Sequence, residues 1–404
     1  MVKFEIPRGS ASQTVSIIDS TSMLANFKIT DLATPGLPDV NLFATLPAFS
    51  FFVTDSSGKR KVLFDLAFRK DPENYSPFLK RTLVKHKWDC TAEKNVKEVI
   101  EEHGVSAHDI EAIIWSHPHF DHTGDPSTFP PETNLIVGPG FKKAMLPGYP
   151  ANLESPILQT DYEYDEPYSP ASKREPVFNS IISRRGRNLI EIDFTGKDVF
   201  KIGRFPALDY FGDGSFYLLD APGHAPGHIC GLVRTTASGD GNGDTFMFLG
   251  GDAIHHAGEL RPSEHRPLPQ QILPHPLAPV GIDAPAHRKQ ASIPFCPGDA
   301  IEHLQVSRNR VPADKTPFYD PALFIDFDEA CETIKKMQEA DWRDDIFIMF
   351  AHDECSLGVV DMFPKPANHW KEKGWAEKTR WRFLKDLGGA VYKDSVQRDH
   401  IAFS

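Results

Sequence analysis

Residues 116–122 of the 404-residue chain read Ser-His-Pro-His-Phe-Asp-His, and they follow the apolar run 110–115. The run has the length and composition of a buried strand. Rigid scaffolds often present reactive side chains on the loop that follows a strand. The stretch therefore predicts a cluster of metal-type ligands at the end of a strand, with His117, His119, Asp121 and His122 as the candidates.

Three other apolar runs, 216–219, 245–249 and 346–350, end in the same way. They lead to His224, Asp252 and His352, respectively. Together with the four residues of the first stretch, these make five imidazoles and two carboxylates, which can hold two divalent metals. Imidazole and carboxylate suit Zn(II) well, with Fe(II), Mn(II) and Co(II) as competitors.

Composition and charge make nucleic acids and anionic membranes unfavourable partners. The chain is 40% hydrophobic and 25% charged, which is ordinary for a soluble globular protein. Its formal net charge of -12 disfavours nucleic acids and anionic membranes, and we expect a small-molecule substrate, with an oligomer left open. The five cysteines include no C-x-x-C pair, which argues against a disulfide framework and a thiolate zinc site.

The chain begins without an apolar signal segment, and no apolar stretch approaches the roughly 18 residues of a membrane span. We therefore expect a cytoplasmic enzyme.

Hydrophobic patterning predicts alternating strands and helices. We expect strands at 14–18, 49–54 and 189–194, a hairpin over 49–65, and helices over 89–103, 328–340 and 370–387. Asp326 or Asp328 would cap the second helix. Such alternation indicates an α/β layered domain.

The candidate ligands span residues 117–352, so we expect one domain over 1–404, with loop insertions at about 150–188 and 255–325 and a helical tail at about 365–404. The second insertion begins just after Asp252 and should cover the metal site. Residues 262–321 contain twelve prolines, which favours a fixed, extended segment there.

Several motifs resemble those of the metallo-β-lactamase superfamily. Residues 117–122 match its H-x-H-x-D-H pattern, and residues 221–228 (A-P-G-H-A-P-G-H) are similar to its T-P-G-H-T-x-G motif. Gly251-Asp252, His352-Asp353 and an early L-F-D strand at 63–65 complete the resemblance, which covers roughly residues 45–355. The implied fold is an αββα sandwich, with two metals at one edge of its two sheets.

The resemblance also implies how the ligands divide. Asp252 would bridge the two metals. The first metal would be held by His117, His119 and His224, and the second by Asp121, His122 and His352. His228, the second histidine of its motif, is expected to pack or support rather than to bind metal.

Two metals about 3.5 to 4 Å apart share a water and lower its pKa toward neutrality, which supplies a hydroxide nucleophile. One metal would polarise the scissile carbonyl, and Asp121 could relay a proton to the leaving group. A serine nucleophile is not required, and no G-x-S-x-G motif is present.

The ligand set looks most like the lactonase-like branch, whose members open cyclic esters such as N-acyl-homoserine lactones. Those enzymes often carry a tyrosine three residues after the bridging aspartate, where this chain has His255. Either the imidazole takes over the tyrosine's catalytic role, or the substrate differs, or His255 is structural. A bulky aromatic lactone, a cyclic amide or a carbamate is an alternative substrate, because fungal-type members that open plant lactams look similar.

Other functions on this fold remain open. A thioesterase of the glyoxalase II type shares the metal motif, and thioester turnover would reveal it. An iron-dependent sulfur dioxygenase would contain one iron per chain, and a diiron flavoprotein would carry a glutamate where His119 stands. A nuclease of the RNase Z type is disfavoured by the acidic balance. A non-catalytic binding protein would have lost a ligand.

Overall fold

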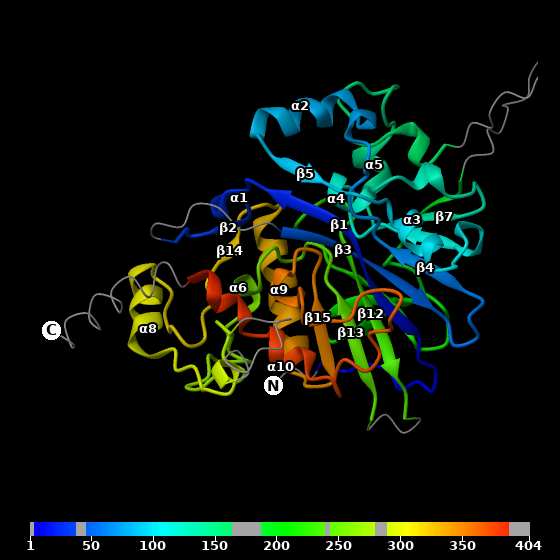
Figure 1. The fold of residues 1–404 in the computed structure, drawn as a ribbon. Helices are drawn as coiled ribbons and strands as arrows, with labels where there is room; N and C mark the ends of the chain where they lie inside the picture. Colours follow the sequence, from blue (N-terminus) through cyan, green and yellow to red (C-terminus); the bar gives the residue numbers. More distant parts are fainter. Residues whose placement is uncertain (1–3, 38–45, 164–186, 239–242, 279–288, 388–404) are drawn as a thin grey trace, which may run out of the picture.

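The computed structural model describes residues 4–37, 46–163, 187–238, 243–278 and 289–387. These residues form two sheets that pack face to face (Figure 1). The first sheet has the strand order β5-β1-β3-β4-β6-β7-β8. Its strands are β1 (Thr14–Ala25), β3 (Leu46–Thr54), β4 (Lys61–Phe64), β5 (Asp89–Thr91), β6 (Ala112–Ile114), β7 (Asn134–Val137) and β8 (Leu189–Glu191).

The second sheet has the order β15-β13-β12-β11-β10-β9. Its strands are β9 (Phe200–Ile202), β10 (Phe205–Asp209), β11 (Phe216–Asp220), β12 (Ile229–Thr236), β13 (Thr245–Leu249) and β15 (Ile346–Met349). Strands β4, β6, β7 and β8 run parallel, as do β13 and β15, whereas the other pairs are antiparallel. The two short strands β2 (Ala33–Thr34) and β14 (Asp320–Pro321) pair separately.

Three apolar clusters define four layers. The cluster between the sheets joins residues of the first sheet, such as Phe64, to residues of the second, such as Met247. A second cluster covers the outer face of the first sheet and includes Ile100 of α3 (Val96–Glu102). A third covers the second sheet and includes Met337 of α9 (Phe327–Asp341). The αββα sandwich predicted from the sequence is therefore confirmed.

Apart from α3, the other helices of the described residues are all shorter than α9. They are α1 (Ile29–Leu32), α2 (Pro77–His86), α4 (Phe120–Thr123), α5 (Phe141–Met145), α6 (Ala257–Leu260), α8 (Gly298–Ser307) and α10 (Trp375–Thr379). In the described parts of the chain, no helix is both long and apolar enough to cross a membrane.

Two predicted helices are wrong in part. The first three residues of the predicted helix 89–103 form edge strand β5 on β1, and the helix begins only after Asn95, whose backbone N–H donates to Glu98 Oε2 (2.9 Å). The predicted helix 370–387 is two pieces, α10 and the 3₁₀ helix Arg382–Leu387. The chain turns between them because Trp375 packs between the sheets, whereas Phe383 packs in the outer cluster of the second sheet.

Of the two predicted insertions, the structure describes only part of the first but most of the second. Most of 150–188 lies outside the described residues, as does part of the tail, 388–404. The proline-rich part of 255–325 is not extended throughout, because it contains helix α8. By contrast, the predicted helix 328–340 is confirmed as α9, and Asp326 caps it by accepting from Glu329 N–H (3.0 Å).

Candidate metal centre

The loop after β6 is fixed by a buried carboxylate at the end of the neighbouring strand β4. Asp65 accepts hydrogen bonds from the Ser116 backbone N–H (2.6 Å) and hydroxyl (2.8 Å), and it contacts His122 Nδ1 (2.8 Å). Burial raises the pKa of Asp65. Because Asp65 engages Nδ1, the opposite nitrogen of His122, Nε2, is directed into the centre of the site. The sequence signalled Asp65 only as the end of the L-F-D strand.

A first group of donors meets around His224. The Nδ1 atom of this residue contacts the carbonyl oxygen of Leu323 (3.0 Å), which leaves Nε2 facing the site. That Nε2 lies 3.1 Å from His117 Nε2 and 3.0 Å from His119 Nδ1. Burial and the neighbouring imidazoles lower the pKa of His117 and of His224 well below the ordinary value. These two rings are therefore neutral at pH 7 and can offer lone pairs to a cation.

A second group lies beside the first. His352 Nδ1 contacts the carbonyl oxygen of Pro47 (2.7 Å), and its Nε2 lies 3.2 Å from Asp121 Oδ2. Burial alone would lower the pKa of His122, but the carboxylates of Asp252, Asp121 and Asp65 raise it well above the ordinary value. This side of the site therefore concentrates negative charge that a cation would balance.

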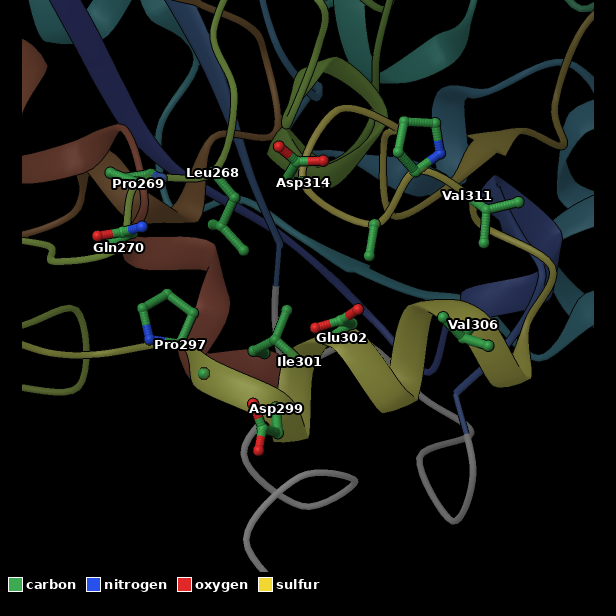
Figure 2. A pocket seen from close by; sticks show the side chains of 13 residues that line it. Leu268, Pro269, Gln270, Pro297, Asp299, Ile301, Glu302, Val306, Val311 and Asp314 are labelled. Atoms are coloured by element: carbon green, nitrogen blue, oxygen red, sulfur yellow. The ribbon is translucent and has the colours of Figure 1, made fainter.

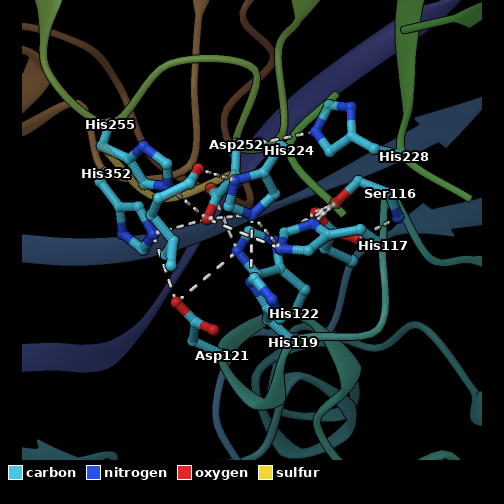
Figure 3. A network of polar contacts seen from close by, with 12 residues as sticks. Ser116, His117, His119, Asp121, His122, His224, His228, Asp252, His255 and His352 are labelled. Carbon is cyan, nitrogen blue, oxygen red and sulfur yellow. Dashed lines mark hydrogen bonds and ion pairs between the residues drawn. The ribbon is translucent and has the colours of Figure 1, made fainter. Parts of the chain in front are cut away.

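Asp252 stands between the two groups (Figure 3). Its Oδ1 lies 3.1 Å from His122 Nε2, and its Oδ2 lies 3.3 Å from His352 Nε2 and 3.6 Å from His117 Nε2. Its backbone N–H donates to His228 Nε2 (3.0 Å), while His228 Nδ1 contacts the Ala221 carbonyl (2.8 Å). His228 thus holds the Asp252 backbone in place, which agrees with the supporting role expected from the sequence.

The structure brings together all seven residues predicted as ligands. The donor atoms in each group lie within 4.8 Å of one another, and Asp252 belongs to both groups. The groups are His117, His119, His224 and Asp252, and Asp121, His122, Asp252 and His352.

The donor set also fits a pair of divalent cations. Among the described residues, His122 Nε2 and Asp252 Oδ1 are buried 3.1 Å from each other as an ion pair, and neither atom forms a hydrogen bond of good geometry. Leaving such atoms without a hydrogen bond is costly, and cation binding would remove the cost. Imidazole nitrogens and carboxylate oxygens are ligands that transition metals of the zinc type accept.

His255 also faces this centre but belongs to neither group. Its Nε2 lies 3.4 Å from Asp252 Oδ2, and its ring stacks on that of His352 (centroids 6.1 Å apart). Within the part of the chain that the structure describes, neither ring nitrogen has a hydrogen-bond partner. The backbone N–H groups of His255 and His256 both donate to Glu259 Oε1 (2.9 Å each), a buried acceptor for which the sequence gave no signal.

A separate cavity of about 420 Å³ lies in the 255–325 region (Figure 2). Helix α8 forms one wall with Ile301 and Glu302, and Leu268 and Asp314 face it from other segments. No predicted ligand lines this cavity, which is therefore distinct from the metal centre.

The fold is that of a metal-dependent hydrolase, and the two donor groups could hold its metal ions. No family model matches the chain. It is 38% identical over 392 residues to gamma-lactamase FDB1 of Fusarium pseudograminearum, covering 95% of this chain and 84% of the relative. It is 37% identical to metallo-hydrolase mfmC of Annulohypoxylon moriforme, covering 96% of this chain and 90% of that protein.

A longer relative is similar over only part of its length. The chain is 39% identical to cytochrome P450 monooxygenase mpaDE' of Penicillium brevicompactum and covers 96% of itself but 39% of that protein. Among solved structures, a variant of AiiA from B. thuringiensis, with N-decanoyl-L-homoserine bound at the active site, aligns with a TM-score of 0.50. That alignment has 16% identity and covers 89% of this chain and 100% of that one, so it bears on the fold. The chain belongs to the metallo-β-lactamase superfamily.

Proposed function

We propose that this protein hydrolyses a cyclic ester or cyclic amide at a centre of two zinc ions. The observation that carries the proposal is the pair of donor groups that share Asp252. In this proposal His117, His119 and His224 would hold one ion, Asp121, His122 and His352 would hold the other, and Asp252 would contribute to both sites. A lactam or lactone substrate is supported by the relative named gamma-lactamase and by the N-decanoyl-L-homoserine bound at the active site of the AiiA variant.

When bound, the two ions would supply Lewis acidity and a water that is acidic near neutral pH. The protein's own contribution is to position and to transfer protons. The oxygen of water adds to the carbonyl carbon of the substrate. The ring C–O or C–N bond then breaks, and the leaving oxygen or nitrogen takes up a proton. Asp121, whose Oδ2 faces His352 at 3.2 Å, is proposed to accept the water proton and pass it to the leaving atom.

His255 is proposed as a second catalytic residue. Its buried Nε2 lies 3.4 Å from Asp252 Oδ2 at the metal centre, and an N–H at this position could donate a hydrogen bond to the substrate carbonyl. A donor placed at a developing oxyanion stabilises the transition state more than the ground state. The single-domain organisation, the covering role of 255–325 and the cytoplasmic location stay predictions.

A hydrolysis screen tests the proposal. Zinc-loaded protein would be offered lactones, lactams, thioesters and phosphodiesters, and a pH-stat would measure the acid released from each. We expect ring opening of a lactone or lactam as the fastest reaction. Faster thioester cleavage would favour the glyoxalase II alternative, and one iron per chain after expression would favour the dioxygenase.

Removal of a proposed ligand tests the site itself. His119→Ala and Asp252→Ala should each reduce hydrolysis by at least about a thousandfold and lower the zinc content, since each change removes a donor atom. His108→Ala, at an exposed position on the 3₁₀ helix before β6, is the control and should keep both. Full zinc content with retained activity in either ligand variant would refute the assignment.

A further inference from the structure

Three large apolar side chains are exposed within four residues at the start of α9. Phe324, Ile325 and Phe327 are 38%, 62% and 42% exposed, and we refer to them as the apolar lip. The rings of Phe324 and Phe327 lie 5.1 Å apart at an interplanar angle of 56°. Scattered apolar residues are normal on a surface, whereas three exposed within four residues, two of them in ring contact, are a candidate for a binding surface.

The lip is bound directly to the loop that carries His224. The Leu323 carbonyl contacts His224 Nδ1 (3.0 Å), and the Gly223 carbonyl accepts from the N–H groups of Ile325 (2.9 Å) and Asp326 (3.0 Å). A Cβ at Gly223 would lie only 2.1 Å from the backbone nitrogen of Ala330 in α9. The lip is therefore held in a fixed position, one residue away from the backbone group that orients a proposed ligand.

His119 is the most exposed of the proposed ligands. Of the seven proposed ligands, His119 is half-buried and the other six are buried. His119 Nδ1 lies 3.0 Å from His224 Nε2, so this partly exposed ligand is next to the ring that the lip segment holds. A substrate that extends from the centre past His119 and His224 would therefore come close to the segment that carries the lip.

The charges near the lip limit what it can bind. Asp326, Asp328 and Glu329 are exposed beside it, and they disfavour an anionic surface or substituent there. An uncharged apolar group meets no such penalty and gains from being removed from water.

We propose that the apolar lip binds an uncharged alkyl or aryl substituent on the substrate ring and so determines substrate selectivity. This inference rests on the proposed ring-opening function and deepens it. The lip residues act on substrate affinity, and they are not part of the chemical step.

The test uses γ-lactones that differ only in the alkyl group on the ring, namely γ-valerolactone, γ-hexalactone and γ-octalactone. The test variant is Phe324→Ser with Phe327→Ser. The control is Trp342→Ser, which removes an aromatic side chain that is 55% exposed at the opposite end of α9, about 22 Å away along the helix. Zinc content and thermal midpoint establish that each variant is folded and loaded.

In the wild type and in Trp342→Ser, kcat/KM should rise with each added CH₂ by up to about fourfold, mainly through KM. In the double variant this gain should disappear, while kcat for γ-valerolactone stays unchanged. An equal gain in the double variant would overturn the proposal. So would a wild-type dimer that the double variant dissociates in light scattering, because the lip would then be a subunit contact.

Failure of the proposed function gives a different result. If the wild type opens no lactone, calorimetric binding of 4-hydroxyoctanoate and 4-hydroxypentanoate still tests the lip. A chain-length preference that is lost only in the double variant would support it. The same preference, or none, in all three proteins would refute it.

Discussion

At the scale of single residues, His255 is the clearest case of a buried polar side chain whose burial lowers the stability of the fold without an evident structural benefit. Its ring is buried against those of His224 and His352, and among the described residues its nitrogens form no hydrogen bond of good geometry, although Nε2 lies 3.4 Å from the Asp252 carboxylate. A group in that condition lowers stability unless a ligand or substrate engages it. The position three residues after Asp252 places that unmet donor at the metal centre.

We predict that His255→Phe lowers kcat by about 100-fold while zinc content is unchanged, because it removes a hydrogen-bond donor but no metal ligand. His255→Tyr should recover part of the rate, since a phenol can donate from a similar position. Steady-state kinetics with metal analysis provides the measurement. An unaltered rate in His255→Phe would make this residue structural.

Asp161 provides a prediction away from the metal centre. Burial raises its pKa to about 7, helped by the carboxylate of Asp125 and opposed by the hydrogen bond from Leu158 N–H. Because the folded protein binds this proton more tightly than the unfolded chain, the associated stability is complete below pH 3.8 and is lost as the pH rises through about 7.

We therefore expect Asp161→Asn, which cannot ionise, to gain stability relative to the wild type as the pH rises from 5 to 8. The difference should grow by up to about 1.4 kcal/mol per pH unit below pH 7. Urea unfolding at each pH would measure it. A constant difference across this range would mean that Asp161 is already ionised at pH 5.

The sequence predicts the ligand side chains better than their supports. His117, His119, Asp121 and His122 could be found because four metal-type residues in six positions are rare. The hydrogen-bond acceptors that orient the imidazole rings could not be found in this way. Two of them are backbone carbonyls, of Leu323 and Pro47, and a carbonyl is the same at every position of a chain.

At the scale of elements, the short apolar runs predict strands because they are buried on both faces of a layered fold. Strand β5 was missed because its pairing with β1 depends on a distant segment, 23–25, rather than on local pattern. The split of the last helix was missed for a related reason. Its aromatic residues pack into two different cores, and sequence periodicity does not distinguish one core from another.

The contact between the His224 loop and α9 can be tested at Gly223. This residue has a φ of +120°, and a Cβ would lie 2.1 Å from Ala330 N and 2.4 Å from Ala330 Cα. Backbone atoms cannot move aside as a side chain can, so Gly223→Ala should separate the loop from the helix.

We predict that Gly223→Ala destabilises the protein by about 3 kcal/mol and weakens zinc binding, as measured by denaturant unfolding and zinc titration. Gly212→Ala is the control, because Gly212 also has a positive φ but a Cβ there meets no described atom within 4 Å. It should cost only about 1 kcal/mol and leave zinc affinity unchanged. Equal effects in the two variants would contradict a role for the close contact.

At the scale of the whole molecule, the proposed centre depends on both sheets. Asp65 and the 117–122 loop come from the first sheet, whereas His224, Asp252 and His352 follow β11, β13 and β15 of the second. The donors meet only when the sheets are packed together, so metal binding and the assembly of the sandwich stabilise each other. The sequence could predict that the donors converge, but not the distances between them.

The most direct test is anomalous diffraction at the zinc edge from crystals of the zinc-loaded protein. The account predicts two peaks per chain, about 3.5 to 4 Å apart, on either side of Asp252. One group of donors should surround each peak. A single peak, or peaks that Asp252 does not join, would contradict the proposed dinuclear centre.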